Sequence, residues 1–156
     1  MTNFNVKYRM ATNADVPALK ELVFSVLEEY GLKPDPDDTD LDLSDIEAFY
    51  FQKGGYFEVC EVEGCVVGSW GLYPNVHDSC ELRKMYLASS QRGKGLGKAM
   101  LERALNKARE MRFKRVELET ASVLKEAVGL YLKHGFTPIT NRHLVERCDQ
   151  AFELYL

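Results

Sequence analysis

The stretch SSQRGKGLGKAM, residues 89–100, decides how the rest of the chain is read. Glycines at alternate positions are interleaved there with cationic side chains: Arg92, Gly93, Lys94, Gly95, Gly97 and Lys98. An amphipathic helix pattern follows, because apolar residues recur at helical spacing from Leu101 to Ala108. Glycine lets the backbone approach a bound group closely, and a helix start carries free N–H groups and partial positive charge. The stretch therefore predicts a cradle for a phosphate group.

Two common phosphate-binding motifs do not fit this stretch. The pattern GxxxxGK[ST] fails because Ala99 follows Lys98 and Arg92 stands where the first glycine belongs. The pattern GxGxxG fails because no glycine stands at its third position. What remains is R-x-x-G-x-G, read at Arg92, Gly95 and Gly97, between a predicted strand and a predicted helix.

Hydrophobic periodicity predicts the other elements. Alternating or continuous apolar runs predict strands at residues 8–12, 56–62, 65–73, 79–89, 115–120 and 150–156, and an extended segment at 136–139. Helical spacing predicts a helix opened by Asp15 and Pro17, one after Ser44, one after the glycines, and one at 123–134. Ser44 and Glu47 have the spacing of a capping box. The final strand-helix-strand-helix-strand order predicts an α/β domain around a mixed sheet.

The strand before the glycines changes phase. Cys80 and Leu82 share one inward phase, whereas Met85 and Leu87 have the opposite one. A β-bulge produces a phase change of one residue. Such a bulge would separate this strand from its neighbour and free backbone groups for a ligand. The alternative, that Tyr86 rather than Met85 faces the core, fits the pattern equally well.

The composition is that of an ordinary soluble domain, with 156 residues of which 46% are hydrophobic and 28% charged. We therefore expect one domain over residues 1–156. The chain has no run of about 18 apolar residues and no apolar stretch of a signal peptide near residue 1, so we expect a cytoplasmic protein without a membrane partner. The four cysteines form no CxxC pair and no local zinc motif, so we expect reduced thiols and no metal.

The net charge of −4 hides an asymmetry. Residues 28–47 contain nine acids and one base, whereas residues 83–115 contain eleven bases and two acids. An acidic chain with one basic segment is a poor general nucleic-acid binder, so we expect no nucleic-acid partner. The basic segment could bind one small polyanion, and the acidic segment could attract a cation. The alternative is two solvated faces of opposite sign.

Two segments then identify a resemblance to a known family. ELRKMYLASSQRGKGLGKAMLERAL resembles the acetyl-CoA-binding motif of the GNAT acetyltransferase superfamily, and KEAVGLYLKHGF resembles the motif that follows it. The resemblance extends from about Cys80 to Phe136. It implies a mostly antiparallel sheet flanked by helices, with a splayed strand pair that forms the CoA cleft. It also implies that acetyl-CoA is the cosubstrate and that the acetyl group moves directly to a primary amine of a small molecule or peptide.

The resemblance assigns cofactor-binding residues. In the family, loop amides hold the CoA pyrophosphate, which here implies Arg92, Gly93, Lys94, Gly95, Leu96, Gly97 and Lys98. The preceding strand pairs its backbone with the pantetheine, which by position implies Met85 and Leu87. A strand N–H, that of Leu87 or its neighbour, would donate to the thioester oxygen.

Two residues are candidates for catalysis. Tyr131 matches the family tyrosine that contacts the cofactor and supplies a proton or hydrogen bond to the departing thiolate. The alternative for Tyr131 is an aromatic side chain that only packs on the sheet. Glu81 begins the strand that leads to the thioester and is our candidate general base, with an exposed strand residue as the alternative.

The sequence departs from the family at one position and leaves several alternatives open. Many members carry an asparagine seven residues before the tyrosine, where this chain has Leu124; either Ser122 substitutes or the contact is absent. A catalytically silent acyl-CoA-binding or sensing module is the second function class, and a nucleic-acid binder is the third. No motif names the acceptor, and a homodimer is a common arrangement in the family.

The acidic segment 35–45 has two interpretations. Its carboxylates would attract a cationic amine to the site, or they only keep a loop solvated.

Overall fold

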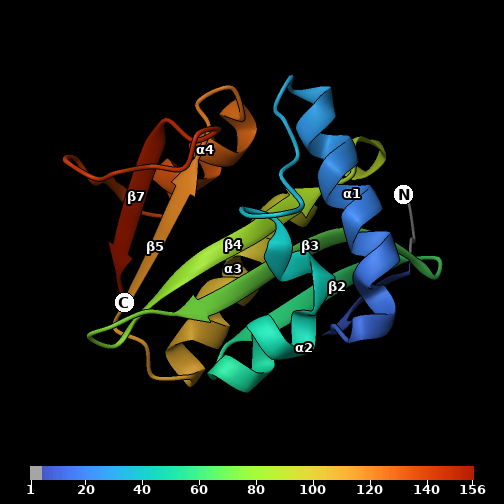
Figure 1. The fold of residues 1–156 in the computed structure, drawn as a ribbon, viewed down its shortest axis with the longest axis horizontal. Coiled ribbons are helices and arrows are strands. Elements are labelled where there is room, and N and C mark those ends of the chain that lie inside the picture. The colour runs from blue at the N-terminus through green and yellow to red at the C-terminus, as the bar shows by residue number, and fades with distance from the viewer. Residues whose placement is uncertain (1–4) are drawn as a thin grey trace.

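The computed structural model of the chain describes residues 5–156, which fold around one sheet (Figure 1). The strands in this range are β1 (Val6–Met10), β2 (Tyr56–Val62), β3 (Cys65–Pro74), β4 (Ser79–Leu87), β5 (Arg115–Thr120), β6 (Thr137–Pro138) and β7 (Gln150–Tyr155). Their order across the sheet is β1-β2-β3-β4-β5-β7-β6. Among these strands β4 and β5 form the parallel pair, and the other neighbours are antiparallel. This mixed, mostly antiparallel sheet confirms the predicted fold class.

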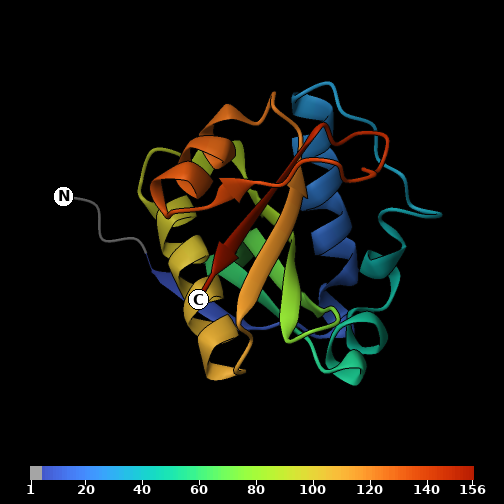
Figure 2. The same cartoon turned by 90° about the vertical axis from the view of Figure 1, so that its left-hand side faces the viewer.

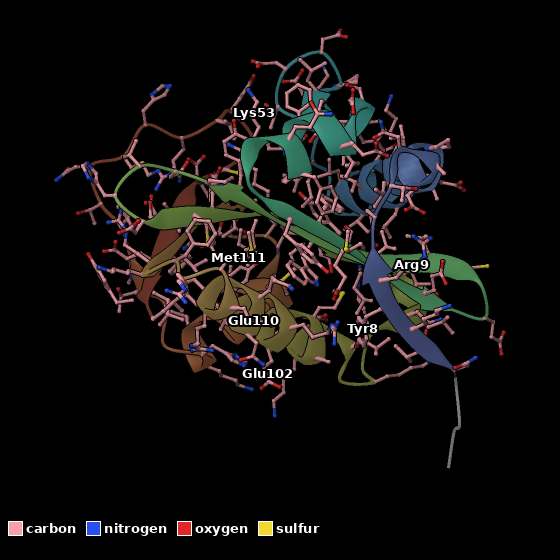
Figure 3. All side chains as sticks on the ribbon, turned by 90° about the horizontal axis from the view of Figure 1, so that it is seen from below. Tyr8, Arg9, Lys53, Glu102, Glu110 and Met111 are labelled. Carbon is pink, nitrogen blue, oxygen red and sulfur yellow. The ribbon has the colours of Figure 1, made fainter. Side chains whose placement is uncertain are left out.

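Helices cover both faces of the sheet (Figure 2). They are α1 (Val16–Glu29), α2 (Ile46–Phe49), α3 (Leu96–Glu110) and α4 (Lys125–Lys133), with the 3₁₀ turns η1 (Asn13–Asp15), η2 (Leu41–Ser44), η3 (Phe51–Lys53) and η4 (Ser89–Gln91). In Figure 3, α1 and α2 lie on one face and α3 lies on the other. Tyr8 and Arg9 of β1 point to opposite faces: Arg103 stacks over the Tyr8 ring at 4.2 Å, and Arg9 bonds Asp15 at 2.7 Å. Within residues 5–156, no helix has the length and apolarity of a membrane span.

Each face of the sheet has its own apolar core. One cluster lies between the sheet and α3 and α4, with Trp70, Met100 and Phe152 among its buried members. The other lies between the sheet and α1 and α2, with Leu19 and Phe57 among its buried members. The apolar stripes predicted for α1 and α3 are buried, so hydrophobic burial fixes both helices against the sheet.

Two helix starts differ from the sequence prediction. Asp15 precedes α1 as expected, but its carboxylate accepts from the Thr12 N–H at 2.9 Å and makes no cap bond to α1 itself. The predicted capping box of Ser44 and Glu47 is wrong. Ser44 belongs to η2 and donates its hydroxyl to the Leu41 carbonyl at 2.6 Å, so it cannot cap α2. The extended residue before α2 is Asp45, whose carboxylate accepts from the backbone N–H of the third helical residue at 3.0 Å.

The predicted bulge in β4 is confirmed. Gly71 pairs with Arg83, but the next pair along is Ser69 with Tyr86, so β4 contains one extra residue at this point. Lys84 accommodates the bulge with φ of +54°. Met85 then packs against the apolar cluster between the sheet and α3, and Tyr86 packs against the cluster between the sheet and α1. The two neighbouring side chains thus lie on opposite faces of the sheet.

The predicted splayed strand pair is also confirmed. The ladder between β4 and β5 consists of Ser79↔Arg115, Cys80↔Val116 and Glu81↔Glu117. Beyond these pairs β5 continues to pair with β7 as far as Thr120, while β4 continues to pair with β3 as far as Leu87. In Figure 1 the two strands lie together at one end and diverge toward α4. The divergence opens the centre of the sheet.

Candidate active site

Two cavities lie where β4 and β5 diverge. The large cavity, of about 470 Å³, is lined by residues from both splayed strands, from α4 and from the loops before η2 and β7. The small cavity, of about 90 Å³, is lined by the end of β4, the start of α3 and parts of α1 and α4. The two cavities share the lining residues Met85, Tyr86, Leu124 and Ala127. They therefore meet just after the bulge of β4.

The glycine stretch forms the predicted open helix start beside the small cavity. Gly93 and Gly95 have φ of +78° and +81°, and nothing lies within 4 Å of a Cβ added to either. Glycine is therefore required there by the backbone conformation rather than by crowding. The amide of Ala99 donates to the Gly95 carbonyl at 3.1 Å. The preceding amides belong to the first turn, where no helical carbonyl can reach them, and Gly95 has no side chain to cap them.

Gly97 and Arg92 position this loop in different ways. A Cβ at Gly97 would lie 3.2 Å from Leu130 Cδ1, so α3 packs tightly against α4 at this point. The Arg92 guanidinium donates to the Leu87 carbonyl at 2.9 and 3.2 Å and to the Tyr30 hydroxyl at 3.1 Å. It also pairs with the carboxylate of Glu29, so its charge is partly neutralised. The Arg92 side chain ties the loop to β4 and α1, while Lys98 is exposed.

Tyr131 both packs in the core and lines the large cavity. Its ring is 5% exposed and packs against Phe136 and Phe152, with centroids 5.6 and 6.5 Å away. It also lines the large cavity. Burial raises the pKa of its hydroxyl above 10.0, with smaller contributions from Tyr86 and Cys148. The hydroxyl is therefore protonated at neutral pH and can donate.

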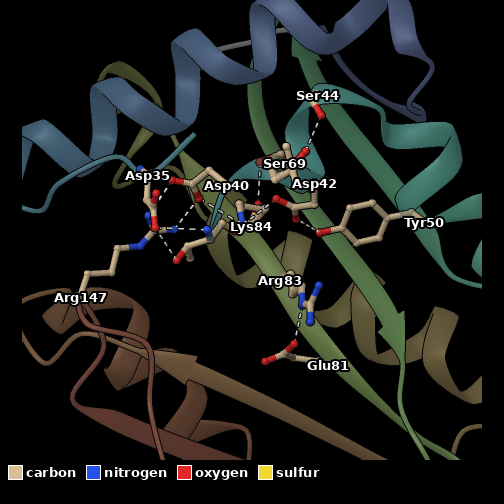
Figure 4. Close-up of polar contacts among 12 residues, drawn as sticks. Asp35, Asp40, Asp42, Ser44, Tyr50, Ser69, Glu81, Arg83, Lys84 and Arg147 are labelled. Carbon is tan, nitrogen blue, oxygen red and sulfur yellow. Dashed lines mark hydrogen bonds and ion pairs between the residues drawn. The ribbon is translucent and has the colours of Figure 1, made fainter. Parts of the chain in front are cut away.

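Glu81 lies on the wall of the large cavity, at the last pair of the β4–β5 ladder. Its carboxylate accepts from Arg83 Nε and lies 3.9 Å from Arg142 Nη2. Figure 4 shows the contact between Glu81 and Arg83. The Glu81 carboxylate thus lies on the cavity wall with two guanidinium groups beside it.

The position that differs from the family lies between the cavities. Leu124 lines both of them, so an apolar side chain lies at their junction, just before α4. Ser122 has a different partner, because its backbone N–H and its hydroxyl both donate to Asp149 at 2.7 Å. The Ser122 hydroxyl is thus bonded to a residue that lines neither cavity.

A buried charge cluster beside the cavity was not predicted. Asp40 and Asp42 are 1% and 5% exposed. Lys84 Nζ lies 3.3 Å from Asp40 and 3.1 Å from Asp42, Arg147 pairs with Asp40, and the Tyr50 hydroxyl donates to Asp42 (Figure 4). The sequence alternatives for this segment were attraction of a cationic amine and a solvated loop. Burial rules out the solvated loop for Asp40 and Asp42, and their pairing with cations leaves neither carboxylate exposed to attract an amine. Lys84 at the bulge and Arg147 in the loop before β7 provide the opposite charges for these two carboxylates.

Comparison with known proteins assigns the family. The family model described as Acetyltransferase (GNAT) family matches residues 20–136. The chain belongs to the GNAT acetyltransferase family. It is similar to the uncharacterized N-acetyltransferase YjgM of Escherichia coli (strain K12), with 43% identity over 136 residues that cover 84% of this chain and 81% of YjgM. It is also 37% identical over 108 residues to N-acetylaspartate synthetase of Xenopus tropicalis, covering 67% of this chain but only 40% of that protein.

Solved structures share the fold at low identity. A GNAT-family acetyltransferase from Staphylococcus aureus Mu50 superimposes with a TM-score of 0.90 at 21% identity, covering 97% of this chain and 99% of that one. A predicted acetyltransferase from Clostridium acetobutylicum, solved with acetyl-CoA, superimposes with a TM-score of 0.74 at 20% identity, covering 91% of this chain and 96% of that one. These likenesses establish the fold.

Proposed function

We propose that this protein transfers the acetyl group of acetyl-CoA to a primary amine of a small molecule or peptide. The observation that carries the proposal is the meeting of the two cavities at the bulge of β4. The small cavity leads from the glycine loop, and the large cavity contains the candidate acid and base. Membership of the GNAT family supports the proposal, and one relative is named for an N-acetylated amino acid.

The residues that would hold acetyl-CoA line the small cavity or lie beside it. The first-turn amides of α3 and the left-handed Gly93 and Gly95 form a concave, positively polarised surface that suits the pyrophosphate. The pantetheine arm would follow the end of β4, where Met85 and Leu87 have no ladder partner on β5. The Leu87 carbonyl already accepts a hydrogen bond from Arg92, so we propose that the Leu87 N–H, rather than the carbonyl, bonds acetyl-CoA.

The chemistry then needs a base, a donor to the carbonyl and a proton for the thiol. Acetyl-CoA supplies a thioester whose carbonyl carbon forms a C–N bond with the neutral amine while its C–S bond breaks. Glu81 accepts the proton that the amine loses, directly or through water. The Leu87 N–H donates to the carbonyl oxygen as negative charge develops. Tyr131 donates its hydroxyl proton to the departing sulfur. Glu81 then releases the proton that it accepted to solvent and Tyr131 takes one up, so both groups return to their starting states.

The test is a measurement of thiol release from acetyl-CoA with a panel of amino acids, polyamines, aminoglycosides and peptides. We expect release of free CoA that requires both the protein and one class of amine, together with an acetylated product of the expected mass. A protein that binds acetyl-CoA but releases no thiol above background with any amine would instead be an acyl-CoA-binding or sensing module.

A further inference from the structure

We propose that Arg83 is the carboxylate-binding residue of the large cavity, so that the acceptor is an amine that also carries a carboxylate. The inference rests on the proposed function for this cavity and narrows its acceptor class. Arg83 lies on β4 between Glu81 and the bulge, and its side chain lines the cavity with 33% of its surface exposed.

The Arg83 guanidinium is held in one orientation. Its Nε donates to the Glu81 carboxylate, and its central carbon lies 4.0 Å from the centroid of the Tyr73 ring. One edge of the planar group is thus fixed by a charged hydrogen bond, and one face by stacking. Within residues 5–156, neither terminal nitrogen of Arg83 makes a hydrogen bond. The group is therefore fixed in place with its terminal nitrogens available.

The other cations that line the cavity are already engaged. Arg147 uses both terminal nitrogens on the carboxylate of Asp40. Lys84 Nζ lies between Asp40 and a second buried aspartate and donates to a backbone carbonyl at 3.2 Å. Arg142 donates to two glutamates of β5. Among the described lining residues, Arg83 is thus the cation whose terminal nitrogens can meet a ligand.

The chemistry of this group selects a carboxylate. The two terminal nitrogens of a guanidinium match the two oxygens of a carboxylate in a bidentate pair, which is stronger and more directional than a bond to a neutral amide. Arg83 precedes Met85, where the cavities meet, by two residues of strand. A small amine held by its carboxylate at Arg83 would therefore have its nitrogen near that junction. Amino acids carry both an amine and a carboxylate and therefore fit this site.

The test measures binding separately from turnover. The protein is saturated with CoA, and the binding of the twenty amino acids, β-alanine and 4-aminobutyrate is compared with that of their carboxamides by calorimetry and ligand-observed NMR. We expect at least one carboxylate to bind about tenfold to a hundredfold more tightly than its carboxamide. Arg83→Gln should abolish this preference and Arg83→Lys should restore it in part. Arg109→Gln, which removes an exposed arginine of α3, should leave it unchanged.

The outcomes separate this inference from the proposed function. Equal binding of carboxylates and carboxamides, a preference that survives in folded Arg83→Gln, or no binding of any carboxylate would overturn the inference. Carboxylate-selective binding that requires Arg83, but without thiol release, would preserve the carboxylate site and remove the catalytic role. Turnover only with amines that lack a carboxylate would preserve the enzyme and overturn the role of Arg83.

Discussion

Arg147 and Asp40 lie 107 positions apart, and both terminal nitrogens of Arg147 bond the Asp40 carboxylate, at 2.7 and 2.6 Å. Asp40 belongs to the loop between α1 and η2, and Arg147 to the loop before β7. These loops pack on different sides of the divergence between β4 and β5. The pair therefore joins the two halves of the sheet at the end where their strands do not meet.

This pair should contribute strongly to stability. Removal of Arg147 leaves the buried Asp40 carboxylate with only Lys84 and the Asp35 N–H as partners, so Arg147→Gln should lower the free energy of unfolding by about 3 kcal/mol. Urea denaturation measures the change. As a control, Lys114→Gln removes a cation whose ion pair with Asp78 is 80% and 68% exposed, and it should cost less than about 1 kcal/mol. A similarly small effect of Arg147→Gln would contradict the prediction.

Stability should also fall in acid through Asp40. Burial raises the pKa of this carboxyl, but the bonds from Arg147 and from the Asp35 N–H, with the charge of Lys84, outweigh burial and lower the pKa below 3.8. A carboxyl with a lowered pKa in the folded state stabilises the protein above its ordinary pKa, and this contribution is lost as the pH falls below 3.8. The free energy of unfolding of Asp40→Asn should therefore fall less steeply between pH 5 and pH 3 than that of the wild type. Parallel curves would argue against this role.

Tyr131→Phe should separate catalysis from binding. The ring keeps its packing against Phe136, but the donor to the leaving sulfur is lost, so kcat should fall about a hundredfold or more. The dissociation constant of acetyl-CoA should change by less than about twofold. Tyr155→Phe, at an exposed tyrosine of β7, is the matched control. A loss confined to acetyl-CoA affinity would mean that Tyr131 only packs against the cosubstrate.

Glu81→Gln should slow the reaction most at low pH, where little of the amine is neutral and a base is most needed. The KM of a carboxylate acceptor should also rise, because Glu81 fixes the orientation of Arg83. Rates measured from pH 6 to pH 9 test both effects, with Glu110→Gln on the exposed end of α3 as the control. A pH–rate profile and a KM that match the wild type would exclude Glu81 from both roles.

Gly95→Val should weaken CoA binding beyond its effect on folding. Gly95 and Gly64 have φ of +81° and +80°, and neither has an atom within 4 Å of an added Cβ. Valine at either position therefore introduces a similar backbone strain, but only the loop at Gly95 is proposed to hold the pyrophosphate. We expect a loss of tenfold or more in CoA affinity for Gly95→Val and none for Gly64→Val, by calorimetry. Equal affinities in the two folded variants would rule out the cradle.

The sequence predicted the features that depend on local patterns. The phase change between Leu82 and Met85 suggested the bulge as one of two interpretations, because alternation in a strand reports which face a side chain occupies. The glycines at 93 and 95 identified the loop because glycine readily adopts positive φ. Both signals lie within a few residues of the structure that they predict.

The sequence could not predict features that depend on distant partners. Asp40 and Asp42 lie in a strongly acidic stretch that resembles a solvated loop, and nothing near them indicates the cations that bury them. Arg83 lies in a basic segment, and its contact with Tyr73 depends on the register of β3 and β4. Ser44 and Asp45 are both good N-cap residues. Asp45 caps α2 because Ser44 is the last residue of η2, which the sequence pattern did not reveal.

The short ladder between β4 and β5 sets the length of the large cavity. It ends at Glu81 and Glu117, and a strand rises about 3.3 Å per residue. One further pair would move the point of divergence by about 3.3 Å toward the bulge and shorten the large cavity by the same amount. Under the proposed function, a change in the length of this ladder would change the length of amine that the large cavity accepts, without altering the glycine loop proposed to hold acetyl-CoA.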